Sequence, residues 1–234
     1  VEISYSDPMY DIDTNVRSTL ILLKYVEKYC PNAHFIYASS MSVYGGNEPI
    51  PKKEDMNLDG ENFYAIGKKA SEEYLRIYSK KGLKTTSIRL FNIYGPGQNL
   101  SNLSQGMISI YVAQALNSNK VVIKGALNRT RDFVYIDDVI SYLRKIENNK
   151  KSFSKSINLC SGKEYSVETI ISYINKIVGH DLEIINKSST PGDIERMVGD
   201  NKLLKEITNS YFNTELYAGI NEMIKRYHED SYFE

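Results

Sequence analysis

Side chains that bind soft metals are scarce in this sequence of 234 residues, which contains two cysteines and three histidines. Cys30 and Cys160 form no CxxC pair and lie far apart, so the simplest interpretation is a reduced, cytoplasmic protein. His34, His180 and His228 are scattered, without a metal-ligand spacing to a cysteine or an acidic residue. We therefore expect no metal site.

A net charge is also lacking, because 29 lysines and arginines balance 29 aspartates and glutamates. Balanced charge gives no electrostatic footprint for nucleic acid or for an anionic membrane surface. No apolar run approaches the roughly 20 residues of a membrane span, and we expect no signal peptide. These absences exclude nucleic acid and membrane from the expected partners. With 41% hydrophobic residues, the chain can bury one good-sized core, or one core and a smaller lobe.

Helix and strand patterns alternate along the chain. Apolar residues at helical spacing predict a helix over 12–29, after a start signal at Pro8, and another over 63–81 that Gly82 ends. Short apolar runs predict strands at 34–39 and 83–91. Further strands are expected at 121–124, 132–135, 156–160 and 182–186, and further helices near 105–116, 138–147, 167–177, 201 and 214. This alternation predicts an α/β fold with a Rossmann-like, doubly wound parallel sheet.

The central chemical feature is the segment Tyr64-Ala-Ile-Gly-Lys68. Residues four apart share a helix face, so the Lys68 ammonium can lie about one turn from the Tyr64 phenol. A nearby cation favours the phenolate and lowers a pKa that starts near about 10. Tyr64 is therefore a candidate general base or acid for a substrate hydroxyl. The spacing alone proves nothing, because chance produces such pairs in a chain rich in tyrosine and lysine.

Other polar segments accompany this pair at strand ends. The run Ala38-Ser-Ser-Met-Ser-Val-Tyr-Gly45 ends one predicted strand, and Arg89-Leu-Phe-Asn-Ile-Tyr-Gly-Pro-Gly97 spans the end of the next. A third run, Arg131-Asp-Phe-Val-Tyr-Ile-Asp-Asp138, follows further along. Because α/β proteins bind ligands at the carboxyl ends of parallel strands, a serine there can bind a substrate oxygen and relay its proton to Tyr64.

In this order and spacing, the four motifs resemble the NAD-dependent epimerase/dehydratase family of extended short-chain dehydrogenases/reductases. The resemblance covers residues from about Asp7 to Asp200. It implies a nucleotide-diphosphate sugar as substrate, NAD as cofactor and a homodimer formed through the helices at 12–29 and 63–81. It also implies a dinucleotide-binding domain of residues 1–92 and 133–161, and a substrate-binding lobe of residues 93–132 and 162–234.

The same resemblance assigns roles to individual residues. Ser40, Tyr64 and Lys68 would be catalytic, and Tyr64 and Lys68 would also contact NAD. Asn15, Ser39 and Phe91 would complete the cofactor site, and Asn92, Arg131 and Asp193 would bind the sugar nucleotide. Arginine suits a pyrophosphate because its planar fork donates two hydrogen bonds.

Structural roles remain open for several of these residues. Ser40 could form a turn at a strand end, and Asn92 could tie down a turn. Arg131 could pair with Asp132 or Asp137 on the surface. Asp193 after Gly192 is ordinary turn chemistry, and Phe91 could be core packing.

Four departures from the family pattern narrow the expected chemistry. Met41-Ser42 stands where sugar dehydratases place an Asp-Glu pair, so water elimination is not expected. Decarboxylases of the family keep a glutamate at the position of Ser42. Many members of the family also have a basic residue at the position of Thr190. The sequence also has no glycine-rich GxxGxxG loop, since Gly45-Gly46 and Gly95-Pro-Gly97 follow the wrong strands.

The favoured function is epimerisation at C4 of a nucleotide sugar through a 4-keto intermediate. One alternative is a nucleotide-sugar ketoreductase with the same Ser-Tyr-Lys set. Another is a truncated chain without catalysis, because the resemblance implies roughly 60–80 further residues ahead of Val1. On that view, residues 1–234 alone would bind NAD weakly, would tend to aggregate and would be inactive.

Overall fold

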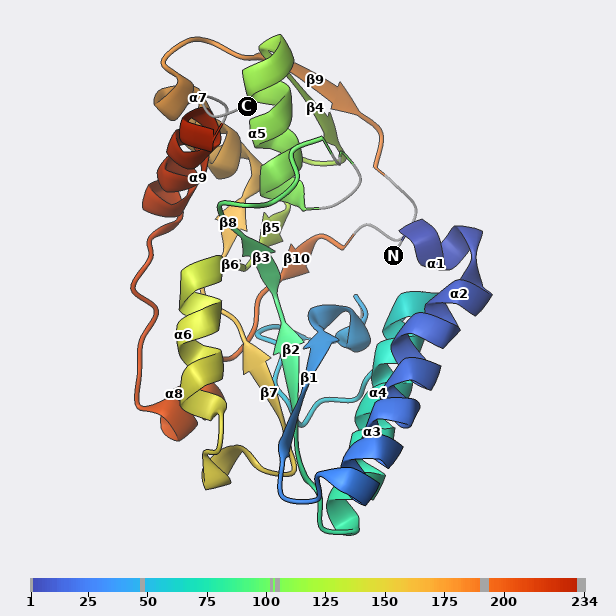
Figure 1. The fold of residues 1–234 in the computed structure, drawn as a ribbon. Coiled ribbons are helices and arrows are strands. Elements are labelled where there is room, and N and C mark those ends of the chain that lie inside the picture. The colour runs from blue at the N-terminus through green and yellow to red at the C-terminus, as the bar shows by residue number, and fades with distance from the viewer. Residues whose placement is uncertain (1, 47–48, 102, 104–105, 190–193, 231–234) are drawn as a thin grey trace. The chain divides into compact units, whose positions relative to one another are not determined.

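The computed structural model describes residues 2–46, 49–101, 103, 106–189 and 194–230 (Figure 1). The chain divides into two compact units. Unit 1 consists of Val1–Phe91, Tyr142–Leu159 and Gly199–Ser210, and unit 2 of Asn92–Ser141, Cys160–Val198 and Tyr211–Glu234. This division differs from the one expected from the sequence, which placed 133–141 with the first unit and 199–210 with the second.

Hydrogen bonding and packing explain both differences. Strand β6 (Phe133–Tyr135) pairs in parallel with β3 (Asn92–Tyr94), which ties it to unit 2. Helix α8 (Lys202–Thr208) packs against β7 (Lys155–Leu159) in unit 1. The Asn149 side chain also donates to the carbonyl of Ile207 at 3.0 Å. A short helix after a long loop gives no sequence signal for the sheet it packs on.

Unit 1 is built on a parallel sheet of three strands in the order β1-β2-β7. Strand β1 (His34–Ser40) leads through 3₁₀-helix η2 (Met41–Tyr44) and helix α4 (Phe63–Lys80) to β2 (Lys84–Leu90). Ser40 therefore lies opposite Leu90 at the carboxyl ends of neighbouring strands. This β-α-β unit confirms the parallel α/β fold predicted from the alternation of patterns.

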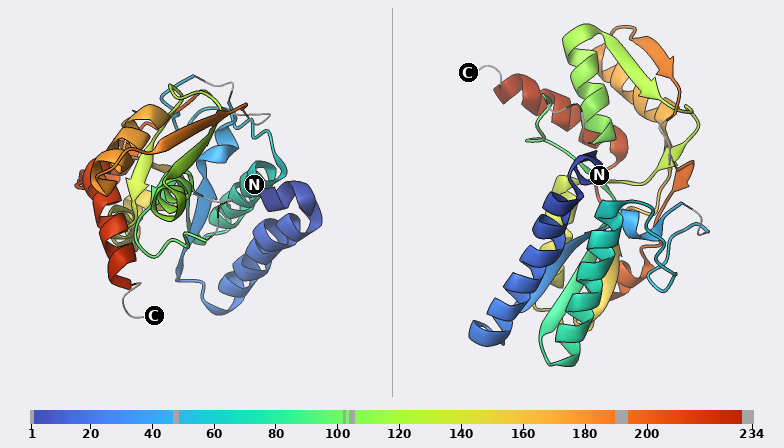
Figure 2. Two further views of the ribbon diagram at one scale, coloured as in Figure 1. Left: turned by 90° about the horizontal axis from the view of Figure 1, so that it is seen from above. Right: turned by 90° about the vertical axis from the view of Figure 1, so that its right-hand side faces the viewer.

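The amino-terminal helical region starts earlier than the expected residue 12. Helix α1 (Glu2–Ser6) precedes α2 (Pro8–Ile12), whose first residue is proline and whose N-cap is Asp7. The Asp7 carboxylate accepts from the backbone of Tyr10 at 2.9 Å. A π-helical turn, η1 (Asp13–Arg17), then joins α2 to α3 (Ser18–Tyr29). Helix α3 lies beside α4, as Figure 2 shows in its right-hand view.

Strands β1 and β2 of this sheet differ in how far they are covered. Strand β2 has partners on both sides and is buried over Thr85–Arg89. Strand β1 pairs only with β2 among the described residues, and its Phe35 and Ile36 stay half-buried while Ala38 is exposed. Parallel sheets are normally covered on both faces and continue across several strands. The open edge of β1 is therefore the least covered part of the sheet.

Unit 2 combines small sheets with three longer helices. Strands β4 (Lys120–Lys124) and β9 (Glu183–Lys187) pair in parallel, and β5 (Thr130–Arg131) lies between β8 (Tyr165–Ser166) and β10 (Arg196–Met197). Helices α5 (Met107–Ser118), α7 (Val167–Val178) and α9 (Leu216–Asp230) enclose an apolar core that includes Ile108, Ile170 and Ile220. Helix α6 (Ile136–Ile146) carries residues of both units.

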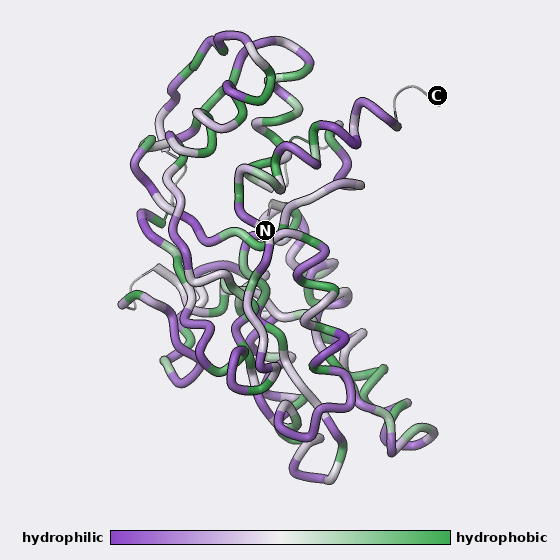
Figure 3. Tube along the Cα trace, turned by 90° about the vertical axis from the view of Figure 1, so that its left-hand side faces the viewer, coloured by the Kyte–Doolittle hydropathy of each residue, from purple (hydrophilic) through white to green (hydrophobic). Residues whose placement is uncertain are grey.

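Hydrophilic and hydrophobic residues alternate in short stretches along the trace in Figure 3. In the described part of the chain, no helix combines the length and apolarity that crossing a membrane requires.

Candidate active site

Helix α4 presents Tyr64, Lys68 and Glu72 at successive intervals of four residues. Asn62 caps the helix, because its side-chain oxygen accepts from the backbone of Ala65 at 2.9 Å. The cap fixes the first turn, and Tyr64 lies in that turn. The tyrosine therefore stands on a defined helix start rather than on a fraying end.

Ser40 and Tyr64 come together at the end of β1. Ser40 is the N-cap of η2, and its hydroxyl oxygen accepts from the backbone of Ser42 at 3.2 Å. Its hydroxyl also donates to the Ser42 side chain at 3.0 Å. Burial raises the pKa of the half-buried Tyr64 phenol, and hydrogen bonding with the Ser40 side chain opposes that rise. The expected Ser-Tyr pair is thus formed within unit 1.

Lys68 completes the group from the next turn of α4. Its ammonium donates to the carbonyl of Ala38 at 2.9 Å. It lies 5.4 Å from the ring centroid of Tyr64 and 4.9 Å from that of Tyr37. Burial lowers the pKa of Lys68, and the charge of Asp11 raises it. The backbone bond holds Lys68 at the strand end, over both aromatic rings.

One electrostatic expectation is wrong for this structure. We expected the cation at Lys68 to lower the pKa of Tyr64, but the pKa is raised from its ordinary value. Burial is the largest cause, and the charge of Asp11 adds to it, while Ser40 acts in the opposite direction. Spacing on a helix reveals neither burial nor a third charge, so the sequence could not supply the sign.

We expected three further residues to contact the cofactor, and in the structure each of them makes contacts within the protein. The Ser39 side chain is buried, and its hydroxyl donates to Glu72. The Asn15 amide donates to Asp11 at 3.0 Å. Phe91 is buried in the core. Cofactor contacts by these residues stay a prediction, and the structure places Ser39 and Asn15 in unit 1 beside the Tyr64 helix.

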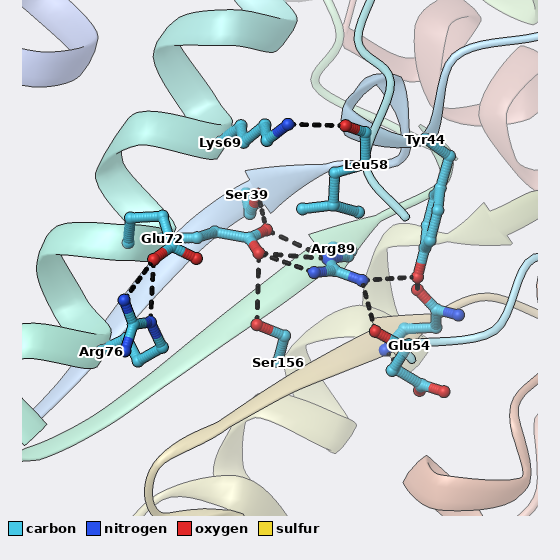
Figure 4. A network of polar contacts seen from close by, with 11 residues as sticks. Ser39, Tyr44, Glu54, Leu58, Lys69, Glu72, Arg76, Arg89 and Ser156 are labelled. Atoms are coloured by element: carbon cyan, nitrogen blue, oxygen red, sulfur yellow. Dashed lines mark hydrogen bonds and ion pairs between the residues drawn. The ribbon is translucent and has the colours of Figure 1, made fainter. Parts of the chain in front are cut away.

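A buried ion pair joins α4, the helix of Tyr64 and Lys68, to β2 (Figure 4). The guanidinium of Arg89 on β2 donates to the carboxylate of Glu72 on α4, with the shortest contact at 2.8 Å. The side chains of both partners are 5% exposed. Ser39 on β1 and Ser156 on β7 also donate to Glu72. One carboxylate therefore links the catalytic helix to all three strands of the sheet.

The same network extends to the loop that follows Ser40. Arg89 donates to the Tyr44 hydroxyl at 2.8 Å, and that hydroxyl donates to the Asn158 side chain at 2.7 Å. Glu54 accepts from the backbone of Asn158 at 2.9 Å. Burial raises the pKa of Tyr44 to about 12, although the positive charge of Arg89 opposes this. Because each polar group has a partner, the network can fix the ends of β1 and β2 without orphaned charges.

Sequence reasoning missed Glu72 and Arg89, although two signals were present. Glu72 follows Tyr64 and Lys68 on the same helix face, two turns after the tyrosine. Arg89 lies within a strand buried on both faces, where an apolar residue is the usual occupant. A charged residue at such a position needs a buried counter-charge.

Two of the residues in unit 2 that we expected to bind the substrate make hydrogen bonds within the protein. The Asn92 amide donates to the Asp132 carbonyl at 2.8 Å, as the turn-forming alternative would require. Arg131 is buried, and its guanidinium donates to the Thr130 carbonyl at 2.8 Å and to the Glu195 carbonyl at 3.4 Å. Asp193 lies outside the described residues.

A cavity of about 620 Å³ lies in unit 2 near these residues. It is lined by Gly125, Ala126, Arg129, Asn186, Lys187, Ser188, Ser189, Ile194 and Glu195. The volume falls in the range of small-molecule sites, about 300–1,000 Å³. Sequence reasoning did not single out these residues.

A parallel α/β unit with serine at a strand end and a Tyr-x-x-x-Lys pair on the following helix defines an extended short-chain dehydrogenase/reductase. Residues 1–160 match the model of the NAD dependent epimerase/dehydratase family, so the chain belongs to this family. The family is NAD-dependent, and NAD is therefore the dinucleotide that concerns this site.

Named relatives cover more than one reaction. A Methanocaldococcus jannaschii protein with a provisional UDP-glucose 4-epimerase name is 30% identical over 200 residues, which is 85% of this chain. GDP-6-deoxy-D-talose 4-dehydrogenase of Aggregatibacter actinomycetemcomitans is 30% identical over 191 residues, or 80% of this chain. The solved UDP-glucose 4-epimerase of Thermotoga maritima, with UDP-glucose, is 27% identical with a TM-score of 0.93.

The chain is shorter than these relatives. It spans 64% of the Methanocaldococcus jannaschii protein and 63% of the Aggregatibacter actinomycetemcomitans enzyme. The comparison with the Thermotoga maritima structure includes 98% of this chain and 74% of the solved chain.

Proposed function

We propose that this chain carries the proton-transfer site of a nucleotide-sugar 4-epimerase. The observation that carries the proposal is the grouping of Ser40, Tyr64 and Lys68 at the end of β1, with α4 joined to β2 by the Glu72–Arg89 pair. Tyr64 accepts the proton of the sugar 4-hydroxyl and later returns it to the 4-oxygen. Ser40 hydrogen-bonds the same oxygen, and the Lys68 ammonium stabilises the phenolate.

The residues present fit one end of NAD. An ammonium group has three donors, and the described bond to Ala38 uses one of them, which leaves Lys68 able to donate to a ribose hydroxyl. The sequence provides no glycine-rich turn for the pyrophosphate. When bound, NAD supplies a reversible two-electron oxidant for the sugar carbon. Tyr64 and Lys68 would hold its nicotinamide end.

Unit 2 would bind the nucleotide part of the substrate. Arg131 donates bonds from a buried position, and Arg129 lines the cavity in the same unit. Guanidinium groups suit a diphosphate because they donate paired hydrogen bonds. In this proposal, Asn92, Arg131 and Asp193 bind the sugar nucleotide, and the cavity accommodates part of it.

The residues after Ser40 argue against two other reactions of the family. Met41 and Ser42 form the start of η2, and neither side chain can act as a carboxylic acid or base. Relatives include a UDP-glucuronic acid decarboxylase from Xenopus tropicalis, 26% identical over 230 residues. Besides bound NAD as hydride acceptor, epimerisation needs only the Ser-Tyr-Lys group and a nucleotide clamp, and it fits the residues present.

Proton nuclear magnetic resonance tests the proposal with UDP-glucose and UDP-N-acetylglucosamine, using the longest expressible form of the protein with NAD added. We expect the C4 epimer to accumulate until both epimers are at equilibrium. A protein that binds NAD and the sugar nucleotide without forming a C4 epimer would contradict the proposal.

A nucleotide-sugar ketoreductase is the second candidate, and the identity with a GDP-6-deoxy-D-talose 4-dehydrogenase favours it. Both candidates use the same three residues. They differ in the cofactor, because an epimerase ends each cycle with NAD in its starting redox state. Stoichiometric consumption of NADH or NADPH with a keto sugar would establish the reductase.

A chain without catalysis is the third candidate, and NAD binding by residues 1–234 tests it. For residues 1–234 alone we expect weak or undetectable NAD binding by calorimetry. Micromolar binding by this chain would mean that other residues replace the loop.

The same proposal includes a homodimer through 12–29 and 63–81. Helices α3 and α4 expose large apolar side chains at Ile21, Tyr25, Tyr29, Ile66 and Ile77. Adjacent exposed apolar side chains of this kind mark an association surface. Sedimentation should give twice the monomer mass, and Ile21→Glu with Tyr25→Glu should give the monomer. A monomeric wild type at high concentration would contradict this proposal.

A further inference from the structure

A buried carboxylate lies against the catalytic helix and belongs to none of the roles above. Asp11, in helix α2, is 6% exposed. Its Oδ1 accepts from the Asn15 amide at 3.0 Å. Its Oδ2 is buried and has no hydrogen-bond partner within the described parts of the chain. A buried carboxylate oxygen without a partner is costly, so its retention calls for an explanation.

The backbone on both sides brings Asp11 close to α4. Helix α2 packs on α4, and the contact falls at Gly67, between Tyr64 and Lys68. A Cβ at Gly67 would lie 3.3 Å from Oδ2 of Asp11 and 3.5 Å from the Val16 side chain. Glycine at this position therefore permits the close approach of the carboxylate.

The π-helical turn η1 fixes the same approach. The Ser18 backbone donates to the carbonyl of Asp13, five residues earlier. The Asn15 carbonyl accepts from Thr19 at 2.8 Å and from Ser71 of α4 at 2.7 Å. Such turns occur frequently at functional sites. The bond between Ser71 and the turn holds α4 against the segment that carries Asp11.

We propose that Asp11 is a positioning residue whose carboxylate sets the charge balance of the Tyr64–Lys68 pair. This inference rests on the proposed function, in which Tyr64 must both accept and return a proton. A single negative charge beside both groups would favour the protonated form of each, which keeps Lys68 cationic and makes the Tyr64 phenolate a stronger base towards the sugar hydroxyl.

The electrostatics of the surrounding groups agree with this geometry. The charge of Asp11 raises the pKa of Tyr64 in addition to burial, and it raises the pKa of Lys68 against burial. Among the described residues, Ser40 and Tyr37 from β1 also lie near the pair, and Glu72 on α4 acts on Tyr37. Glu72 is paired with Arg89. Asp11 therefore acts on both members of the pair in the same direction.

The pH dependence of turnover in Asp11→Asn tests the inference in the longest expressible form of the protein. The substitution is isosteric, and its amide oxygen can still accept from Asn15. Removing a negative charge makes loss of a proton easier for both groups. We expect the acid limb, from Tyr64, and the alkaline limb, from Lys68, to move together to lower pH. Asp13→Asn is the matched control, because Asp13 is exposed in the adjoining turn and pairs with Arg17. Its profile should match that of the wild type.

A second readout does not require turnover. The ultraviolet absorbance of phenolate, titrated in the wild type and in Tyr64→Phe, gives the titration of Tyr64 by difference. The same difference in an Asp11→Asn background should have a lower midpoint. Asp11→Ala serves the same purpose if the asparagine variant does not fold.

Three results would overturn the inference. They are an unmoved Tyr64 titration in a folded variant, limbs that move in opposite directions, and a lower plateau without a shift of either limb. A lowered Tyr64 midpoint in a protein without epimerase activity would uphold the inference and reject the proposed function.

Discussion

The two units stabilise their interiors in different ways. Around Glu72, unit 1 buries an ion pair, a tyrosine, an asparagine and a serine in one polar network, which the half-buried Ser156 joins. Its buried apolar side chains include the cluster of Leu23, Tyr37, Leu75, Tyr78 and Leu83. In unit 2, an apolar core lies around α5, α7 and α9. Polar networks specify geometry when every member is satisfied, and apolar packing tolerates more change. Unit 1 should therefore be sensitive to the loss of single polar groups.

The largest expected effect lies in the catalytic group of unit 1. Tyr64→Phe should lower turnover by about 10²–10⁴-fold, because it removes the group that transfers the proton. The ring remains, so the free energy of unfolding should change little. Steady-state kinetics measures the effect, and Tyr74→Phe on the same helix is the control. Wild-type turnover in Tyr64→Phe would remove Tyr64 from the mechanism.

Breaking the buried pair tests whether unit 1 depends on its network. Glu72→Leu should lower the free energy of unfolding by about 3–5 kcal/mol, because it leaves Arg89 buried without a counter-charge. The double variant Glu72→Leu with Arg89→Met should recover much of that loss. Urea denaturation measures both.

The neighbouring exposed pair supplies the matched control. Glu73 contacts Arg76 one turn further along α4, and both side chains are 53% exposed. Glu73→Gln should change the free energy of unfolding by about 0–1 kcal/mol. Equal losses of unfolding free energy in Glu72→Leu and Glu73→Gln would contradict the expectation that unit 1 depends on its buried polar network.

A binding experiment sharpens the role of unit 2. Arg131→Ala should weaken binding of a nucleoside diphosphate by roughly ten- to a hundredfold, through loss of a charge-assisted hydrogen bond. Calorimetry with UDP measures the change, and NAD binding should be affected less. Arg226→Ala on the exposed face of α9 is the control, since Arg226 pairs with Glu222 at the surface. Unchanged affinity in Arg131→Ala would return Arg131 to a structural role.

The smallest effect concerns the pH dependence of stability in unit 1. Burial, followed by the charge of Lys84, lowers the pKa of His34 from its ordinary value of 6.5. Nδ1 accepts from the backbone of Asn148 at 3.2 Å, so Nε2 carries the proton in the 2.7 Å contact with Thr86. The unfolded chain therefore binds the proton more readily than the folded chain.

The sign of the effect follows by linkage. The contribution of neutral His34 to stability is complete above pH 6.5 and is lost as the pH falls through the folded-state pKa. Urea denaturation at several pH values should show this slope in the wild type and in the control His180→Gln, and a flatter profile in His34→Gln. A slope unchanged by His34→Gln would assign it to other groups.

Particular residues show how far the sequence could be interpreted. The alternation of strands and helices predicted the parallel sheet of unit 1, because periodicity depends on neighbours along the chain. The Tyr64–Lys68 motif and the Ser40 strand end were predicted as one site for another reason, because α/β proteins bind ligands at the carboxyl ends of parallel strands and because the motifs resemble those of a family. Asp11, Glu72 and Arg89 were not, because their roles depend on contacts between elements distant in sequence. The position of α8 on β7 depends equally on packing that no local pattern encodes.

The most direct test of the central claim uses a nucleotide sugar carrying deuterium at C4, incubated with the longest expressible form of the protein and NAD in ordinary water. If Tyr64 moves only the hydroxyl proton while carbon 4 is oxidised and reduced again, the product epimer should retain its deuterium at C4. Nuclear magnetic resonance of the product measures this retention. Loss of the label to solvent during epimerisation would contradict the account, because it would show that a base removes the carbon-bound hydrogen.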